Sequence, residues 1–150
     1  MKRVPLPDLK KPTERPVALR QGLFTIPDRA RDKPNLIGSK CSNCGLVAFP
    51  KKLTCARCLS SHSKDILLSR EGRVDSFTVV RVDLPGLKAP YIWADVKLPE
   101  GPIVTSQIIG CAPSESEFSM GDRVELTLVK VAEDEHGKEV LDYRFRLLKR

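Results

Sequence analysis

The segments Cys41-Ser42-Asn43-Cys44 and Cys55-Ala56-Arg57-Cys58, separated by ten residues, decide the fold of this chain. Each Cys-x-x-Cys segment offers two sulfurs from one tight turn, and two such turns can complete a tetrahedral shell of thiolates around one Zn²⁺. Gly45 follows the first turn, where glycine tolerates the left-handed backbone that a sharp turn needs. Because four thiolates leave no position for water or substrate, the spacing predicts a structural zinc site rather than a reaction centre.

Two other interpretations of these cysteines stay open at the level of sequence. They could form two disulfides, or remain as buried free thiols. A redox site of the thioredoxin type would require a strand-helix-strand setting, which the surrounding pattern does not indicate. The chain opens with Met1-Lys2-Arg3-Val4-Pro5, without the apolar run of a signal peptide, and it has no stretch near the roughly 18 apolar residues that span a bilayer. We therefore expect a cytoplasmic protein without a membrane segment, in a reducing compartment that suits thiolate ligands.

Length and charge restrict the architecture and the partners. The 150 residues, 41% of them hydrophobic, can form one ordinary core, or a small core with a metal-stabilised module. The net charge of +7 favours nucleic acid as a partner only if the charge is suitably placed. Lys and Arg outnumber Asp and Glu by 10 to 4 in residues 1–40 and by 5 to 2 in residues 41–72. In residues 73–150, by contrast, there are 11 Lys and Arg residues and 13 Asp and Glu residues. The basic character thus belongs to the first half of the chain.

Residues 1–35 are predicted to form a basic, proline-rich arm with a short helix. Four prolines within residues 1–16 forbid a regular helix there, so this part is predicted to be a disordered tail, or an arm that orders along a partner subunit. Residues 17–23 could form the short helix, with Leu19 and Leu23 on one side, before Pro27. Residues 28–35 look like a polar connector.

Residues 36–70 are predicted to form the zinc ribbon. Leu46–Pro50 has the pattern of a short strand that leaves the first turn and ends at a proline. Ile66–Leu68 is expected to return as the second strand. Lys51 and Lys52 follow the first strand, where adjacent loop lysines are most often solvated surface, although they could meet a phosphate. Residues 69–72 mark the boundary to the next module.

Residues 71–150 are predicted to form a five-stranded barrel. Alternating or continuous apolar residues predict strands over residues 73–82, 91–98, 103–109, from 123 onward, and 141–147. In the fourth strand the alternation slips at Val129 and Val131, which suggests a bulge that helps a sheet curl closed. Five strands separated by turns match a Greek-key barrel of the OB type. The chain is therefore predicted to be mainly β.

Few residues outside the four cysteines could carry catalysis. A nucleophile needs a base and a group that orients the base, and the chain has two histidines, His62 and His136, both in polar loops. Cys111, which lies outside the ribbon, is interpreted as a small buried hydrophobe. Neither a glycine-rich phosphate loop nor an HExxH motif occurs. The sequence therefore predicts no catalytic residue of its own.

A single-stranded nucleic-acid-binding OB protein is the alternative function. Such barrels stack bases on aromatic side chains beside a basic groove. Tyr91 with Trp93, and Tyr143 with Phe145, are predicted to share a face of their strands. These side chains could also fill the barrel, and the barrel segment is slightly acidic, so this function ranks second.

The order of arm, four-cysteine ribbon and five-stranded barrel resembles the family of small zinc-ribbon/OB-fold proteins that accompany thiolase-superfamily enzymes and handle acyl-CoA. The resemblance covers about residues 36–148 and rests on Cys41-x-x-Cys44-Gly45, Phe49-Pro50, Cys55-x-x-Cys58, Gly72 and Gly121-Asp122-Arg123-Val124. The family commonly continues Phe-Pro with proline and arginine, where this chain has Lys51-Lys52, and often has proline where this chain has Ala56. These departures leave the four cysteines intact but affect any detailed contact with CoA.

The resemblance implies a non-catalytic, zinc-binding accessory subunit whose larger thiolase-like partner supplies the catalytic cysteine and histidine, with acyl-CoA or CoA bound at the complex. Within the family the chain is similar to the small subunits of thiolases that cleave 2-benzoylsuccinyl-CoA in anaerobic toluene degradation. Other members accompany hydroxymethylglutaryl-CoA synthesis and sterol side-chain aldolases. Lys51, Lys52 and Arg57 are then candidates to meet CoA phosphates or an acidic partner surface. A pure scaffold that joins two enzymes is a third interpretation.

Overall fold

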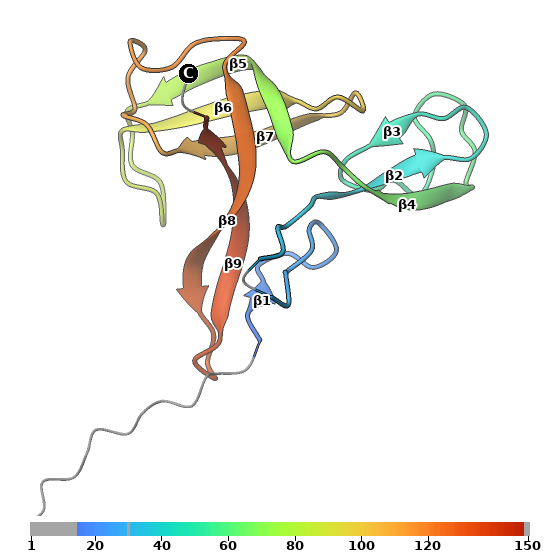
Figure 1. The fold of residues 1–150 in the computed structure, drawn as a ribbon, viewed down its shortest axis with the longest axis horizontal. Helices are drawn as coiled ribbons and strands as arrows, with labels where there is room; N and C mark the ends of the chain where they lie inside the picture. The colour runs from blue at the N-terminus through green and yellow to red at the C-terminus, as the bar shows by residue number, and fades with distance from the viewer. Residues whose placement is uncertain (1–14, 30, 149–150) are drawn as a thin grey trace, which may run out of the picture.

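The computed structural model of this chain describes residues 15–29 and 31–148, so residues 1–14 of the arm predicted over residues 1–35 lie outside the described residues. All the regular elements within the described ranges are β-strands (Figure 1). In order they are β1 (Val17–Ala18), β2 (Ile37–Cys41), β3 (Val47–Ala48), β4 (Ser63–Leu67), β5 (Glu71–Val80), β6 (Tyr91–Lys97), β7 (Ile103–Ile109), β8 (Arg123–Glu133) and β9 (Glu139–Leu147). The mainly β prediction is confirmed. In the part of the chain that is described, no helix has the length and apolar character needed to cross a membrane.

The strands form two sheets that lie apart in space (Figure 1). The smaller sheet has the order β3-β2-β4 and contains the cysteines. The larger sheet has the order β1-β9-β7-β6-β5-β8, and an additional pairing between β8 and β9 closes strands β5 to β9 into a barrel. The predicted five-stranded barrel of the OB type is thus confirmed. The ribbon differs from its prediction because β2, which leads into the first cysteine, is its central strand and had no clear sequence signal.

Two irregularities allow the barrel to close. The first residues of β5 pair with β8 and the rest pair with β6, and the register shifts between Val74 and Ser76. In β8, the register against β9 shifts between Lys130 and Ala132, in the stretch where the sequence alternation slips. An extra residue on one strand bends that strand and increases its twist, which curls the sheet. The predicted bulge in the fourth barrel strand is confirmed.

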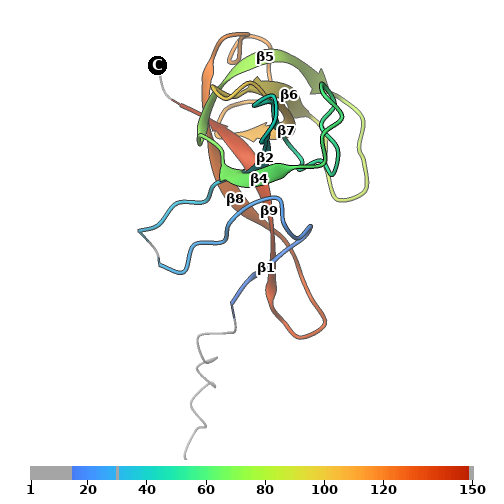
Figure 2. The same ribbon diagram turned by 90° about the vertical axis from the view of Figure 1, so that its right-hand side faces the viewer.

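The interior of the barrel is filled by inward-facing apolar side chains and closed at one end by a loop. The fully buried strand residues include Val96, Val104, Val124 and Phe145. Phe118 lies in the connection between β7 and β8, is itself fully buried, and meets Phe77 edge-to-face with ring centroids 4.9 Å apart. Figure 2 shows this connection arching over the barrel strands.

The same core continues into the ribbon. Leu36, directly before β2, and Leu68, directly after β4, are 0% and 1% exposed, and the Leu68 N–H donates to the Leu36 carbonyl at 2.9 Å. Phe49 of the ribbon and Phe24 of the N-terminal segment both pack edge-on against Tyr143 of β9, with centroid distances of 5.9 and 6.1 Å. Apolar packing therefore sets the orientation of the ribbon on the barrel.

The short helix predicted for residues 17–23 is wrong. β1 instead pairs in parallel with β9, and the Leu19 N–H donates to the Leu141 carbonyl at 2.8 Å. Gly22 has a φ of +81°, which is outside the right-handed helical region. A helix of about two turns is marginal on its own, whereas the edge of β9 offers the segment hydrogen-bond partners directly. Figure 1 shows β1 beside the long β8–β9 hairpin.

Gly72 is required where β5 crosses from β8 to β6. A Cβ at this position would lie 2.6 Å from Cγ1 of Val96 and 2.9 Å from the carbonyl oxygen of Lys97. Because overpacking of this kind costs about 1–3 kcal/mol, we expect Gly72→Ala to lower the free energy of unfolding by about that amount in urea denaturation. Thr78→Ala, at an exposed position of the same strand, is the control and should stay within about 0.5 kcal/mol of the wild type. A fully stable Gly72→Ala protein would contradict this close approach.

Candidate metal centre

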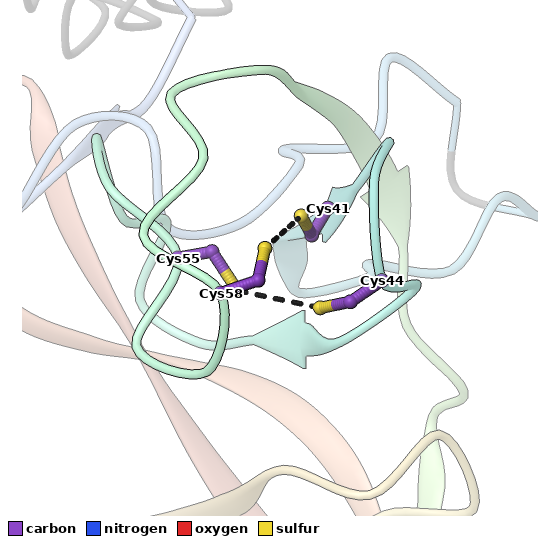
Figure 3. Close-up of side chains that lie close together, drawn as sticks. All are labelled: Cys41, Cys44, Cys55 and Cys58. Atoms are coloured by element: carbon purple, nitrogen blue, oxygen red, sulfur yellow. Dashed lines mark hydrogen bonds between the residues drawn. The ribbon is translucent and has the colours of Figure 1, made fainter.

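The first Cys-x-x-Cys segment forms a tight turn at the end of β2. The Cys41 N–H donates to the Leu46 carbonyl at 2.9 Å, and the Gly45 N–H donates to the Cys41 carbonyl at 3.0 Å. Gly45 has a φ of +77°, as its place after the turn predicts. These bonds reverse the chain and bring the sulfurs of Cys41 and Cys44 toward the same point (Figure 3).

The second segment repeats this turn fourteen residues later. The Cys55 N–H donates to the Ser60 carbonyl at 2.9 Å, and the Leu59 N–H donates to the Cys55 carbonyl at 3.0 Å. Leu59 stands at the position of Gly45 and has a φ of +62°; it is the one non-glycine residue with a positive φ in the described ranges. The sequence contains the signal for this feature, because aligning the two cysteine pairs places Leu59 opposite Gly45.

The four sulfurs converge between the two turns (Figure 3). The Sγ atoms are 3.6 Å apart between Cys41 and Cys58 and 3.5 Å apart between Cys44 and Cys55, and all four lie within 4.8 Å of one another. A disulfide would need about 2.05 Å, whereas thiolates about 2.3 Å from a shared tetrahedral ion lie about 3.8 Å apart. The arrangement fits one metal ion, and an all-sulfur donor set favours zinc among common divalent ions.

The surroundings of the cysteines shift the pKa values of Cys58 and Cys44 in opposite directions. A hydrogen bond from the Asn43 side chain, followed by one from the Ser60 N–H, lowers the pKa of Cys58 to about 6. The Leu46 N–H acts to lower the pKa of Cys44, but desolvation and contacts with the other three thiols raise it to about 11. A metal ion must displace the remaining thiol protons, so metal affinity is expected to fall as the pH falls.

The predicted phosphate-binding candidates of the ribbon are all exposed, but they differ in their contacts. Lys51 Nζ forms an ion pair with Asp65 of β4 at 3.0 Å. Within the described residues, the side chains of Lys52 and Arg57 have no ion-pair partner. These two cations are therefore free to meet an anion outside the chain.

The other residues considered for catalysis have ordinary surroundings. His62 is exposed in the ribbon, and His136 is exposed in the β8–β9 loop with its Nε2 3.8 Å from Glu135. Cys111 is partly buried against the barrel core, as its interpretation as a small hydrophobe predicts. Burial, with the nearby carboxylates of Glu117 and Asp122, raises the pKa of Cys111. A raised pKa keeps the thiol protonated near neutral pH, which opposes nucleophilic attack.

The predicted aromatic pairs do not form a stacking platform. Tyr143 and Phe145 are 7% and 0% exposed and fill the core. Tyr91 is 5% exposed, so it offers no ring to solvent beside Trp93. Trp93, at 40% exposed, is the one member of the four that meets solvent.

A groove of about 430 Å³ lies at the edge of the barrel where β5, β6 and β8 meet. Its lining residues are Glu71, Gly72, Arg73, Lys97, Leu98, Pro99 and Arg123. Arg123 pairs with Glu71 at 2.5 Å, and Arg73 donates to the Gly121 carbonyl at 3.2 Å. Three cations face one carboxylate, so the groove is positive although residues 73–150 are net acidic. Sequence reasoning missed this groove because its cations come from three strands that are distant in the chain.

Comparison with known proteins gives matches to both modules. Residues 28–63 match the family described as ChsH2, rubredoxin-like zinc ribbon domain, and residues 66–129 match ChsH2, C-terminal OB-fold domain. A DUF35 domain-containing scaffold protein of Methanothermobacter thermautotrophicus is 40% identical over 116 residues, which cover 75% of this chain and 84% of the relative. Benzoylsuccinyl-CoA thiolase subunit BbsA of Thauera aromatica is 32% identical over 139 residues, which cover 91% of this chain and 94% of the relative.

Solved structures share the fold. A structure described as Ltp2-ChsH2(DUF35) aldolase has a TM-score of 0.63 at 24% identity, covering 75% of this chain and 84% of that chain. A DUF35-family protein of unknown function from Sulfolobus solfataricus has a TM-score of 0.52 at 21% identity, covering 75% of each chain. At these identities the likeness supports the ribbon-and-barrel fold alone.

We expect the purified protein to contain one Zn²⁺ per chain by elemental analysis, and Cys58→Ser to lose it. The ribbon sheet has three strands, one of them two residues long, so it has too little core to stay folded without the ion. Backbone amide NMR signals of residues 37–67 should lose their dispersion in Cys58→Ser and after removal of the metal by a chelator. Cys111→Ser is the matched control and should retain one equivalent of zinc. A chelated, reduced protein with an intact ribbon spectrum would contradict a structural metal.

Proposed function

Because the chain belongs to the ChsH2/DUF35 family of zinc-ribbon and OB-fold proteins, we propose that it is a non-catalytic accessory subunit of a thiolase-superfamily enzyme complex that acts on acyl-CoA. The observation that carries this proposal is the similarity to a benzoylsuccinyl-CoA thiolase subunit over 91% of the chain, which includes both modules. The partner supplies the nucleophile and the base, since Cys111 has a raised pKa and both histidines are exposed.

The architecture suits an adaptor. The ribbon projects from the barrel (Figure 1), so the two modules offer separate surfaces to a partner. Their shared core, through Leu36, Leu68 and the ring of Tyr143, holds these surfaces in a fixed relation. Fixed surfaces lose little conformational freedom on association, which favours tight assembly.

We assign the phosphates of CoA to the groove between β5, β6 and β8. Arg73, Lys97 and Arg123 provide the positive charge, while Leu98 and Pro99 offer apolar contact. Arginine and lysine are the usual partners of phosphate groups. Lys52 and Arg57 of the ribbon are the alternative contacts. Benzoylsuccinyl-CoA is the first acyl-CoA to test, since BbsA proteins of two organisms, Thauera aromatica and Geobacter metallireducens, are 32% and 33% identical to this chain.

The nucleic-acid alternative has little support. Base stacking by an OB barrel needs several exposed aromatic rings beside a basic groove, and of the two predicted pairs only Trp93 reaches solvent. Binding of an oligonucleotide whose affinity falls steeply between 50 and 200 mM salt, on the scale of phosphate-dominated binding, would restore this alternative.

We expect this chain, coexpressed one at a time with the thiolase-superfamily proteins of its own organism, to elute together with one of them in size-exclusion chromatography. The pair should turn over an acyl-CoA, whereas each component alone should be inactive or at least about tenfold slower, since the accessory subunit completes the site. Mass spectrometry of the peak and a thiolysis assay provide the readouts. Full turnover by the catalytic protein alone would contradict the proposal, and association without any effect on rate would support a pure scaffold.

Charge reversal at Lys97 tests the assignment of the groove. Lys97→Glu should raise the KM for acyl-CoA about 5- to 50-fold with little change in kcat, because it weakens phosphate binding without touching the reacting atoms. Lys88→Glu changes another exposed lysine, outside the groove, and should leave KM within about twofold. Equal KM values for the two variants would contradict the assignment of the CoA phosphates to this groove.

A further inference from the structure

Leu59 occupies a position where the fold gains nothing from a leucine. Its φ of +62° is unfavourable for a residue with a side chain by about 1–2 kcal/mol, and its side chain is 77% exposed. At the matching position of the first turn the chain uses Gly45, with a φ of +77°, and its N–H donates to the carbonyl of the first cysteine of that turn as the Leu59 N–H does. Strain that the structure keeps without a packing contact points to a role outside the folded chain.

A second leucine is displayed on the same turn. Leu53, two residues before Cys55, is 93% exposed. Leu59 directly follows Cys58, so the two leucines flank the second Cys-x-x-Cys segment on both sides. The backbone that carries Leu59 is held by the turn, in which the Leu59 N–H donates to the Cys55 carbonyl at 3.0 Å.

The surroundings of this turn are positively charged. Between residues 37 and 68 the chain has Lys40, Lys51, Lys52, Arg57 and Lys64, all exposed, against the single carboxylate of Asp65. Asp65 is already paired with Lys51 at 3.0 Å. Four thiolates with one dication add about two negative charges, and the module still stays positive. An apolar projection within a positive rim is complementary to an apolar recess bordered by carboxylates.

We propose that the second turn, residues 53–59, is the docking surface for the thiolase-like catalytic subunit. Leu59 and Leu53 insert into an apolar recess on that subunit, and Lys52 and Arg57 meet carboxylates at its rim. The first turn, which carries Gly45, is not part of this surface. This inference rests on the proposed function, because it takes the occupant to be the catalytic subunit.

Leu59→Gly separates docking from folding. In the zinc-loaded protein, glycine relieves the strain at φ +62°, so the melting temperature should stay the same or rise by a few degrees. Affinity for the catalytic subunit identified by coexpression should nevertheless fall about 10- to 30-fold in calorimetry, as for an apolar anchor at an interface. Leu53→Ser should weaken binding similarly. Leu67→Ser is the matched control, since Leu67 is 60% exposed on β4 and lies away from the turn.

The outcomes distinguish this inference from the proposed function. If the wild type binds the catalytic subunit and Leu59→Gly binds equally well, the docking surface is wrong while the proposed function stands. If no thiolase-superfamily protein binds the wild type, the proposed function fails and the docking surface falls with it. A lower melting temperature for Leu59→Gly would show that Leu59 supports the fold, which also overturns the inference.

Discussion

Convergence of four sulfurs is the constraint on which the smaller module depends. The Sγ atoms lie within 4.8 Å of one another because two turns with the same hydrogen bonds face each other. The sheet that supports them has little core of its own, with β3 contributing two residues. Its regularity therefore comes from the turns and the ion they fit, rather than from burial of apolar surface.

The smaller module is joined to the barrel by the packing of two segments on one aromatic ring of β9. Tyr143 of β9 receives Phe24 on one side and Phe49 of the ribbon on another, at 6.1 and 5.9 Å. Edge-to-face contacts of this kind add specific geometry to the burial of apolar area. A tyrosine that could have served as a nucleic-acid platform is thus used to join the modules, and this use explains both its burial and the fixed projection of the ribbon.

Features with a local cause could be predicted from the sequence. The barrel strands and the bulge near Val129 follow from alternation and its slip, and the convergence of cysteines follows from their spacing. Features that depend on distant partners could not be predicted. Residues 17–23 lack a signal for pairing with β9, and the cations of the groove come from three strands that are distant in the chain. The alternation of apolar and polar residues predicts which residues share a face of a strand, but it does not predict which segment will pair with the edge of a sheet.

The distribution of charge in space also could not be predicted from the sequence, and it bears on function. Summed along the chain, residues 73–150 are slightly acidic, which disfavours a bound polyanion. In space, Arg73, Lys97 and Arg123 meet at one groove, while many of the carboxylates lie elsewhere, as in the β8–β9 loop. A phosphate responds to the field within roughly a Debye length of about 8–10 Å rather than to the net charge of the module. A small anionic ligand can therefore bind at this groove even though the barrel segment as a whole carries a slight net negative charge.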